Sequence, residues 1–416
     1  MSKLVVEGGA RLQGTVGVMG AKNAVLKEMV SALLAPGRHR LTNVPGILDV
    51  TLMCEVLGHI GCRVEQGDHE LWLVVPDQLL PEAPIELVRQ MRASIVVLGP
   101  LLARCGEARV ALPGGDDLGA RPIDMHLNGL EAMGVDFELV HGELVGRVDG
   151  RLKGTEVELP FPSVGATENL LFAGVLAEGD TVIVNAAREP EIEDLITQLA
   201  EMGADITGGG TSLVTVHGVE KLAPAEHHVV PDRLEAGTYA TAAAITAGDV
   251  TVTGCTPEHL RMELRKLSEA GCEVEQGNGW LRVRGPERPT PVDFATLPFP
   301  GFHTDMHPQM VAVLSIAAGT SVITENLYDA RFRYVGELAR MGADITTEAQ
   351  HAVIRGVEQL SGCPVLAPDI RAGAALVMAG LRAEGTTEVA DASHIDRGYE
   401  EFPERLRALG ARIERG

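Results

Sequence analysis

The sequence predicts an α/β fold made of repeated units, and two series of glycines support this prediction. In the first series each glycine ends a helical stretch and precedes a small residue and a short alternating strand, as in "AMGVDFEL" and "RMGADITT". These glycines are Gly61, Gly134, Gly203, Gly271, Gly342 and Gly410. Their spacings are 73, 69, 68, 71 and 68 residues, which indicates six copies of one unit.

A second glycine series runs in phase with the first, and strands such as "TVIVNA" and "DVTVTG" follow it. Its members are Gly37, Gly106, Gly179, Gly248, Gly319 and Gly385. Glycine suits the left-handed conformation that closes a helix. We therefore expect two helices alternating with strands in each unit, and six units divide most simply into two domains of three. The length of 416 residues agrees, because a single core rarely grows so large.

One apolar helix is expected before each glycine of the second series, and polar residues begin each of these helices. The starts are Lys22 with Asn23, Arg92, Ser163, Arg233, Asp305 and Arg371. Beyond its first turn each helix is apolar nearly all round, which predicts burial within its domain. Lysine and arginine are poor choices at the positive end of a helix dipole, so their recurrence there predicts an anionic ligand. The expected site is an anion-binding cleft formed by helix starts of both domains.

Composition excludes several classes of partner. With 58 acidic and 35 basic residues the net charge is −23, which argues against a nucleic-acid or anionic-membrane surface. The sequence shows no signal-peptide pattern and no apolar run near the roughly 20 residues that span a bilayer. Six cysteines without a C-x-x-C pair favour a reduced cytoplasmic protein. A monomer is favoured, although the sequence leaves the oligomeric state open.

Motifs for common cofactors and metals are also missing from the sequence. It contains neither a P-loop nor a Rossmann glycine motif. His303 and His307 are four residues apart, but Pro308 and the expected helix start argue against a zinc pair. We therefore expect no cofactor and no metal.

The stretch 111–126, "ALPGGDDLGARPIDMH", combines a glycine loop with an arginine and several acids. A glycine loop beside Arg121 is typical of an anion cradle. Asp117 is interpreted as a solvated loop charge, whereas the role of Asp116 depends on a comparison with known families.

Ten short motifs, in order along the whole chain, resemble the UDP-N-acetylglucosamine enolpyruvyl transferase (1-carboxyvinyltransferase) family. They are "GAKNA" (20–24), "MRAS" (91–94), "LPGG..LGARPID" (112–124), "SVGAT" (163–167), "NAAREPEI" (185–192), "PDR.E.GT" (231–238), "TDMHPQ" (304–309), "ENLYDARF" (325–332), "DIRAGAAL" (369–376) and "HIDRGYE" (394–400). The related shikimate-pathway enzymes do not share "GAKNA" or "HIDRGYE" in this form.

The resemblance implies a two-domain inside-out α/β barrel, the enolpyruvyl transferase fold, with six βαβαββ-type units. It implies one domain of residues 22–230 that carries the catalytic loop, a second domain of 1–21 and 231–416, and an active site in the cleft between them. The implied reaction moves enolpyruvate from phosphoenolpyruvate to the 3′-hydroxyl of UDP-N-acetylglucosamine and releases phosphate. It proceeds by addition and elimination through a tetrahedral intermediate and is the first committed step of peptidoglycan synthesis.

The resemblance also implies roles for individual residues. Lys22, Arg92, Arg121 and Arg397 are similar to the clamp for phosphoenolpyruvate, and Asp305 to the residue that takes the hydroxyl proton. The positions similar to those that contact the UDP-sugar are Asn23, Arg121, Pro122, Ile123, Asp124, Met125, Ser163, Val164, Gly165, Asp305 and Leu327. Asp369 and Arg371 match a D-x-R element near the catalytic loop.

Two positions depart from the family pattern. Phe161 stands where relatives often carry a lysine near the uridine. Asp116 stands where most members carry a cysteine that donates a proton, takes part in product release and is alkylated by fosfomycin. A carboxyl group donates a proton if burial raises its pKa, although nearby arginines oppose such a shift. We therefore expect an active enzyme that resists fosfomycin.

Two alternatives remain open from the sequence. One is an enolpyruvyl transferase for a different acceptor, and the other is a non-catalytic protein that binds UDP-sugars.

Overall fold

The computed structural model describes residues 2–112, 114, 118–119 and 122–416. The chain forms two compact units. Unit 1 comprises Met1–Met19, Asp116–Arg121 and Pro231–Gly416, and unit 2 comprises Gly20–Gly115 and Pro122–Val230.

Unit 2 contains the following elements in chain order: α1 (Lys22–Ser31), η1 (Ala32–Leu34), β3 (Gly37–Thr42), α2 (Leu48–Ile60), β4 (Arg63–Gln66), β5 (Glu70–Val75), α3 (Ile85–Val88), η2 (Arg92–Val97), α4 (Leu98–Cys105), β6 (Glu107–Ala111), α5 (Asp124–Ala132), β7 (Asp136–Val140), β8 (Glu143–Arg147), β9 (Glu156–Glu158), α6 (Val164–Gly174), β10 (Asp180–Val184), α7 (Pro190–Glu201), β11 (Asp205–Thr207), β12 (Leu213–His217) and β13 (Glu226–His228).

Unit 1 contains β1 (Lys3–Glu7), β2 (Gln13–Gly17), α8 (Arg233–Ile245), β14 (Asp249–Thr253), η3 (Pro257–Leu260), α9 (Arg261–Glu269), β15 (Glu273–Gly277), β16 (Trp280–Arg284), β17 (Phe294–Ala295), η4 (Thr304–Met306), α10 (His307–Leu314), β18 (Thr320–Thr324), η5 (Arg331–Tyr334), α11 (Val335–Arg340), β19 (Asp344–Glu348), β20 (His351–Arg355), β21 (Pro364–Leu366), α12 (Ile370–Arg382), β22 (Thr386–Ala390), α13 (Ser393–Asp396), α14 (Phe402–Ala408) and β23 (Arg412–Arg415).

The repeat predicted from the glycines is visible in the order of the elements. Strands and helices β9, α6, β10, α7, β11 and β12 follow one another as one βαβαββ unit. Their sheet has the order β9-β10-β12-β11, with one parallel pair at its edge and two antiparallel pairs. Four other sheets have the same scheme: β13-β3-β5-β4, β2-β14-β16-β15, β17-β18-β20-β19 and β21-β22-β1-β23. In the sixth, β6-β8-β7, the parallel edge strand is reduced to a bridge between Glu82 and Arg109.

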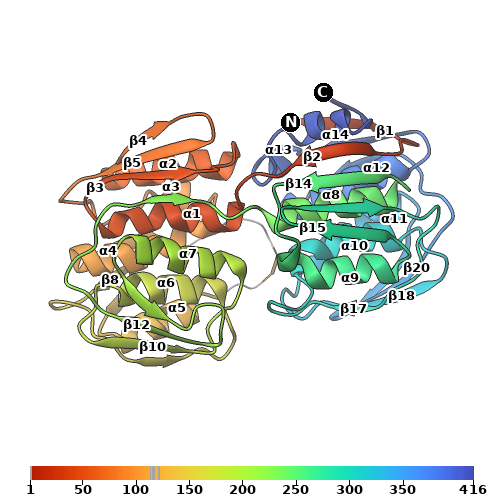
Figure 1. Cartoon of the computed structure of the whole chain (residues 1–416). Helices are drawn as coiled ribbons and strands as arrows, with labels where there is room; N and C mark the ends of the chain where they lie inside the picture. The colour runs from red at the N-terminus through yellow and green to blue at the C-terminus, as the bar shows by residue number, and fades with distance from the viewer. Residues whose placement is uncertain (1, 113, 115–117, 120–121) are drawn as a thin grey trace. The chain divides into compact units, whose positions relative to one another are not determined.

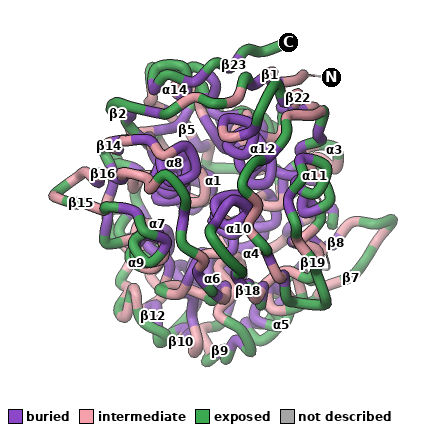
Figure 2. The backbone as a smooth tube through the Cα atoms, turned by 90° about the vertical axis from the view of Figure 1, so that its right-hand side faces the viewer, coloured by how far each residue is buried: buried purple, intermediate pink, exposed green. Residues whose placement is uncertain are grey.

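The helices that precede the second glycine series lie inside each unit, and the strands lie outside them. Every residue of α8 and α10 is buried, and in α12 only the last residue is not. Figure 2 shows these three helices in purple within a rim of strands, and α10 packs against both of the others. This is the inside-out arrangement that the resemblance implies, and the burial of the helices follows from sequences that are apolar nearly all round.

The termini complete sheets within unit 1. Strand β1 lies between β22 and β23, so the N-terminal strand occupies a central place beside the C-terminal one. Figure 1 shows the red strands β1 and β2 among the later elements of this unit. Strand β2 leads along the chain into α1 of unit 2 but pairs in parallel with β14. Strand β13 leads into α8 of unit 1 but pairs in parallel with β3. The two units thus exchange their leading strands where the chain passes between them.

The glycines adopt the expected backbone with one exception. All six of the first series have φ between 93° and 115°. In the second series Gly248 does not take a positive φ, and Ala247 takes it instead with φ 48°. The prediction that the second-series glycines cap the preceding helices holds at Gly106 and is wrong at the other five. The helix caps there are Ala35, Val175, Thr246, Ser315 and Ala383, and each glycine lies beyond them. Gly248 serves close packing, because a Cβ on it would lie 2.3 Å from the carbonyl oxygen of Leu12.

Among the helices of the described residues, none combines the length and apolar character that a bilayer crossing requires.

Candidate active site

The polar helix starts predicted from the sequence are confirmed. Helices α1 and α8 begin at Lys22 and Arg233, and η2 begins at Arg92. Ser163 caps α6, where its hydroxyl oxygen accepts a hydrogen bond from the Ala166 amide at 3.3 Å.

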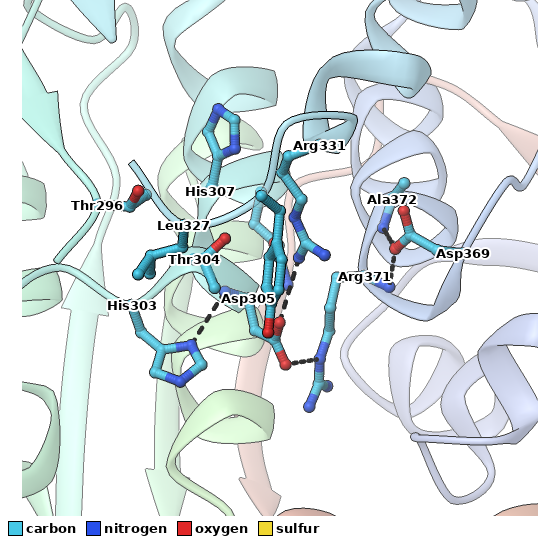
Figure 3. A network of polar contacts seen from close by, with 12 residues as sticks. Thr296, His303, Thr304, Asp305, His307, Leu327, Arg331, Asp369, Arg371 and Ala372 are labelled. Atoms are coloured by element: carbon cyan, nitrogen blue, oxygen red, sulfur yellow. Dashed lines mark hydrogen bonds and ion pairs between the residues drawn. The ribbon is translucent and has the colours of Figure 1, made fainter. Parts of the chain in front are cut away.

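Asp305 lies in η4, the short turn before α10, and two arginines hold its carboxylate. Arg331 Nη2 lies 3.3 Å from Oδ1, and Arg371 Nε lies 3.3 Å from Oδ2. Figure 3 shows the two guanidinium groups approaching from different elements. The arginine side chains are 1% and 3% exposed, whereas the aspartate side chain is 20% exposed. The two buried arginines therefore fix the carboxylate, while part of it remains accessible to solvent.

The residues around Arg371 orient its side chain. Asp369 caps α12, and its Oδ1 accepts hydrogen bonds from the amides of Arg371 and Ala372 at 2.9 Å. The guanidinium carbon lies 5.0 Å from the ring centroid of Tyr399. Burial would lower the pKa of Arg371, but the neighbouring Tyr399, Asp305 and other groups outweigh it and raise that pKa. Arg371 therefore remains a cation while it is buried.

Arg233 also lies in the interior of unit 1. It is 3% exposed, and its guanidinium carbon lies 5.4 Å from the ring centroid of Phe299. The cations at the helix starts of this unit are thus packed among protein groups.

A buried carboxylate shapes the turn that carries Leu327. Glu325 Oε1 accepts hydrogen bonds from the Leu327 and Tyr328 amides at 2.8 and 3.2 Å. Its Oε2 lies 3.2 Å from His307 Nδ1. Burial would raise the pKa of Glu325, but these and other donors lower it overall. The carboxylate thus holds the turn in place as an anion.

In unit 2 a buried aspartate pairs with Lys22. The lysine Nζ lies 3.2 Å from Oδ2 of Asp49, and the two side chains are 15% and 1% exposed. Asp49 lies in the first turn of α2. Asp49 thus holds the ammonium group of Lys22, the residue to which the resemblance assigns phosphoenolpyruvate binding.

Arg92 and His126 form a second polar group in unit 2. Arg92 Nη2 donates to the Pro122 carbonyl at 3.4 Å. His126 is buried, and its Nδ1 lies 2.8 Å from the side-chain nitrogen Nδ2 of Asn169. Burial and the charge of Arg92 lower the pKa of His126 to about 4, against the opposing effect of Asp124. The imidazole is therefore neutral at pH 7 and accepts the amide proton at Nδ1.

The other predicted site residues of unit 2 lie around these groups. Pro122 is exposed, Ile123 precedes α5, and Asp124 begins it. Asp124 Oδ1 accepts a hydrogen bond from the Met125 amide at 2.9 Å. The remaining ones are Asn23 near the start of α1, and Val164 and Gly165 in the first turn of α6.

Three predicted features need separate mention. Asp116, Asp117 and Arg121 lie outside the described residues. Arg397 follows α13 directly and is partly buried, in the expected connection before α14. Phe161 is 39% exposed.

The structure brings forward residues that sequence reasoning missed. Asp49 and Asn169 look like ordinary helix residues in the sequence, so no signal marked them. Arg331 lies in "ENLYDARF", one of the motifs of the resemblance, but the motif itself does not indicate a role for this arginine. A further polar group joins Glu28, Asp194 and His227, which are distant in sequence.

Comparisons with known proteins agree along the whole chain. Residues 6–406 match the EPSP synthase (3-phosphoshikimate 1-carboxyvinyltransferase) family. A UDP-N-acetylglucosamine 1-carboxyvinyltransferase of Corynebacterium jeikeium is 55% identical over 411 residues, covering 99% of this chain and 98% of the relative. The protein of that name from Mycobacterium tuberculosis is 54% identical over 413 residues, with 99% of both chains covered.

Solved structures extend the comparison. The enolpyruvyl transferase of Streptomyces tendae aligns with a TM-score of 0.90 at 25% identity, covering 100% of this chain and 99% of the other. An EPSP synthase of Acinetobacter baumannii, with a TM-score of 0.77 at 20% identity and full coverage of both chains, shares the fold.

Proposed function

Because the chain belongs to the UDP-N-acetylglucosamine 1-carboxyvinyltransferases of the EPSP synthase family, we propose a specific division of labour among its site residues. The protein is a transferase that moves the enolpyruvyl group of phosphoenolpyruvate to UDP-N-acetylglucosamine. The proposal concerns how its own residues carry the protons and charges of that reaction.

Asp305 takes the proton of the 3′-hydroxyl as the hydroxyl oxygen attacks C2 of phosphoenolpyruvate. The observation that carries this assignment is the carboxylate held at 3.3 Å by both Arg331 and Arg371 while remaining 20% exposed. A general base must be fixed in direction and still reach its substrate. The two guanidinium groups supply the fixation.

Lys22, Arg92, Arg121 and Arg397 bind the phosphate and carboxylate groups of phosphoenolpyruvate. Their positive charges offset the charge of an anionic substrate in a protein of net charge −23.

Asp116 donates the proton that C3 receives on addition. The tetrahedral intermediate then loses a proton from C3 and expels phosphate, so that the C2–C3 double bond forms again. A carboxylic acid thus takes the role that the resemblance gives to a thiol at this position, and the enzyme is insensitive to fosfomycin.

The test is phosphate release on mixing the purified protein with phosphoenolpyruvate and UDP-N-acetylglucosamine. We expect release only with both substrates, and we expect Asp305→Asn to lower kcat by about 10²- to 10⁴-fold with a smaller change in KM. A matched control is Asp344→Asn, since that exposed aspartate pairs with the exposed Arg355 at 3.3 Å. Turnover of Asp305→Asn within about tenfold of wild type would contradict the role of the aspartate as base.

A further inference from the structure

We propose that Glu28, Asp194 and His227 of unit 2 bind a zinc ion. The three side chains come from α1, α7 and β13, which pack together within the unit. None of them has a part in the proposed reaction.

The spacing of the three groups suits a shared ion. His227 Nε2 lies 3.4 Å from Oδ1 of Asp194 and 3.7 Å from Oε1 of Glu28. One candidate ligand atom from each residue lies within 4.8 Å of both others. Zinc bonds of about 2.0–2.2 Å in a tetrahedral shell place neighbouring ligands about 3.3–3.6 Å apart.

A buried carboxylate of this group lacks the hydrogen bonds that burial normally requires. Glu28 is fully buried, and neither of its carboxylate oxygens accepts a hydrogen bond from a described residue. Within the same described part of the chain, Nε2 of His227 lies at ion-pair distance from two carboxylates, those of Asp194 at 3.4 Å and Glu28 at 3.7 Å. Burying a carboxylate without hydrogen-bond donors, as at Glu28, is costly. One cation between the three side chains would offset this cost.

A second carboxylate orients the histidine as a ligand. His227 Nδ1 lies 2.8 Å from Oε2 of Glu201, which orients the ring with Nε2 toward Asp194 and Glu28. Burial would lower the pKa of His227, but carboxylates on both sides of the ring raise it overall, so a metal at Nε2 would displace a proton from that nitrogen. The Val230 amide donates to Oδ2 of Asp194 at 2.8 Å, so that oxygen is fixed while Oδ1 faces the histidine. A carboxylate behind a histidine is the usual outer shell of a zinc site.

The ligand set favours zinc over calcium or magnesium. Calcium and magnesium prefer oxygen ligands throughout, whereas an imidazole with two carboxylates suits zinc. The Asp194 side chain is 15% exposed, which admits water as a fourth ligand. The ion would join α1, α7 and β13 and so stabilise unit 2.

The experiment uses the full-length protein, freed of metal by dialysis against a chelator and titrated with Co²⁺ alone as a visible substitute for zinc. We expect one Co²⁺ per chain with the absorption of a tetrahedral site and without sulfur-to-metal charge-transfer bands. The absence of those bands distinguishes this site from binding by the six cysteines. Added Zn²⁺ should displace the cobalt.

Two variants test the assignment separately from folding. Glu28→Leu removes one ligand and needs no hydrogen-bond partner in the buried site, so it should abolish stoichiometric binding. Glu201→Gln keeps all three ligands and should weaken binding about 10- to 100-fold. His217→Gln is the control, because it removes the exposed pair with Asp180 at 2.8 Å and should leave binding unchanged. Circular dichroism checks that each variant is folded.

Three results would overturn the proposal. They are no stoichiometric Co²⁺ on the wild type, a spectrum with thiolate bands, or undiminished binding by folded Glu28→Leu. The first would mean that a proton shared among the carboxylates, and not a metal, neutralises the group.

Discussion

The position of one carboxylate, that of Asp305, depends on residues from two other elements. Arg331 comes from η5 and Arg371 from α12, and each reaches a different oxygen of Asp305. Two contacts on opposite oxygens restrict rotation about the side-chain bonds more than one contact would. The sequence motif was enough to single out Asp305, whereas the orientation of its carboxylate depends on these two arginines.

The aspartate at position 116 predicts resistance to fosfomycin. The drug alkylates a thiolate, and a carboxylate is a much weaker nucleophile toward its epoxide. We expect wild-type turnover to survive prolonged incubation with the drug, and Asp116→Cys to lose activity with time and gain the mass of one drug molecule. Asp116→Ala should lose most turnover with or without the drug. Time-dependent inactivation of the wild type would show that the interpretation is wrong.

His126 predicts a pH dependence of stability. Its pKa is lowered in the folded state to about 4 from an ordinary 6.5, so between these values the unfolded chain binds a proton that the folded chain does not. The free energy of unfolding should therefore fall as pH decreases through this window, by on the order of 1 kcal/mol per pH unit. Urea unfolding at several pH values gives the free energy of unfolding of the wild type and of His126→Gln, and the difference between the two isolates the contribution of His126. If that difference stayed constant between pH 4 and 7, the prediction would be wrong.

At the scale of elements, the helix starts fix the functional side chains. The cap on α12 is the clearest case, because Asp369 satisfies two orphan amides and one of them belongs to Arg371. The cap thus fixes the backbone at Arg371, and with it the point from which the arginine side chain reaches Asp305. The same logic applies to α6, which Ser163 caps.

Removal of the α12 cap should affect both stability and turnover. Asp369→Ala should lower the free energy of unfolding by about 0.5–2 kcal/mol and reduce kcat through displacement of Arg371. Asp369→Ser retains a cap oxygen and should recover most of the stability. Urea unfolding and phosphate release measure the two effects. Equal stability of the alanine and serine variants would argue against the capping role.

At the scale of the whole molecule, six repeats are joined by an exchange of strands. Strands β1 and β2 from the N-terminus complete two sheets of unit 1, and β13 completes a sheet of unit 2. Unit 1 therefore depends on a segment that lies far from its other elements in sequence, whereas β13 follows β12 within unit 2. The N-terminal segment also buries Leu4 and Val6 of β1 and Leu12 before β2, each fully.

Removal of residues 1–19 should unfold unit 1 and spare unit 2. The loss of these buried side chains costs about 1.5–3 kcal/mol each, which together approaches the whole stability of a typical domain. Hydrogen exchange followed by mass spectrometry should show rapid exchange in α8 and α12 and continued protection in α1 and α6. The full chain is the control. Protection of α8 and α12 in the shortened chain would contradict this dependence on β1 and β2.

The resemblance of the sequence to a known family named most of the residues assigned to the reaction, and the sequence by itself determined the repeat and the buried helices. These depend on local physics: glycine closes helices, apolar patterning buries them, and polar residues satisfy their first turns. Tertiary structure decided which partners meet. The pairing of Lys22 with Asp49, the two arginines on Asp305, and the Glu28, Asp194 and His227 group all join residues from separate elements. No local pattern encodes such contacts, because they form only when packing brings distant parts of the chain within a few ångströms.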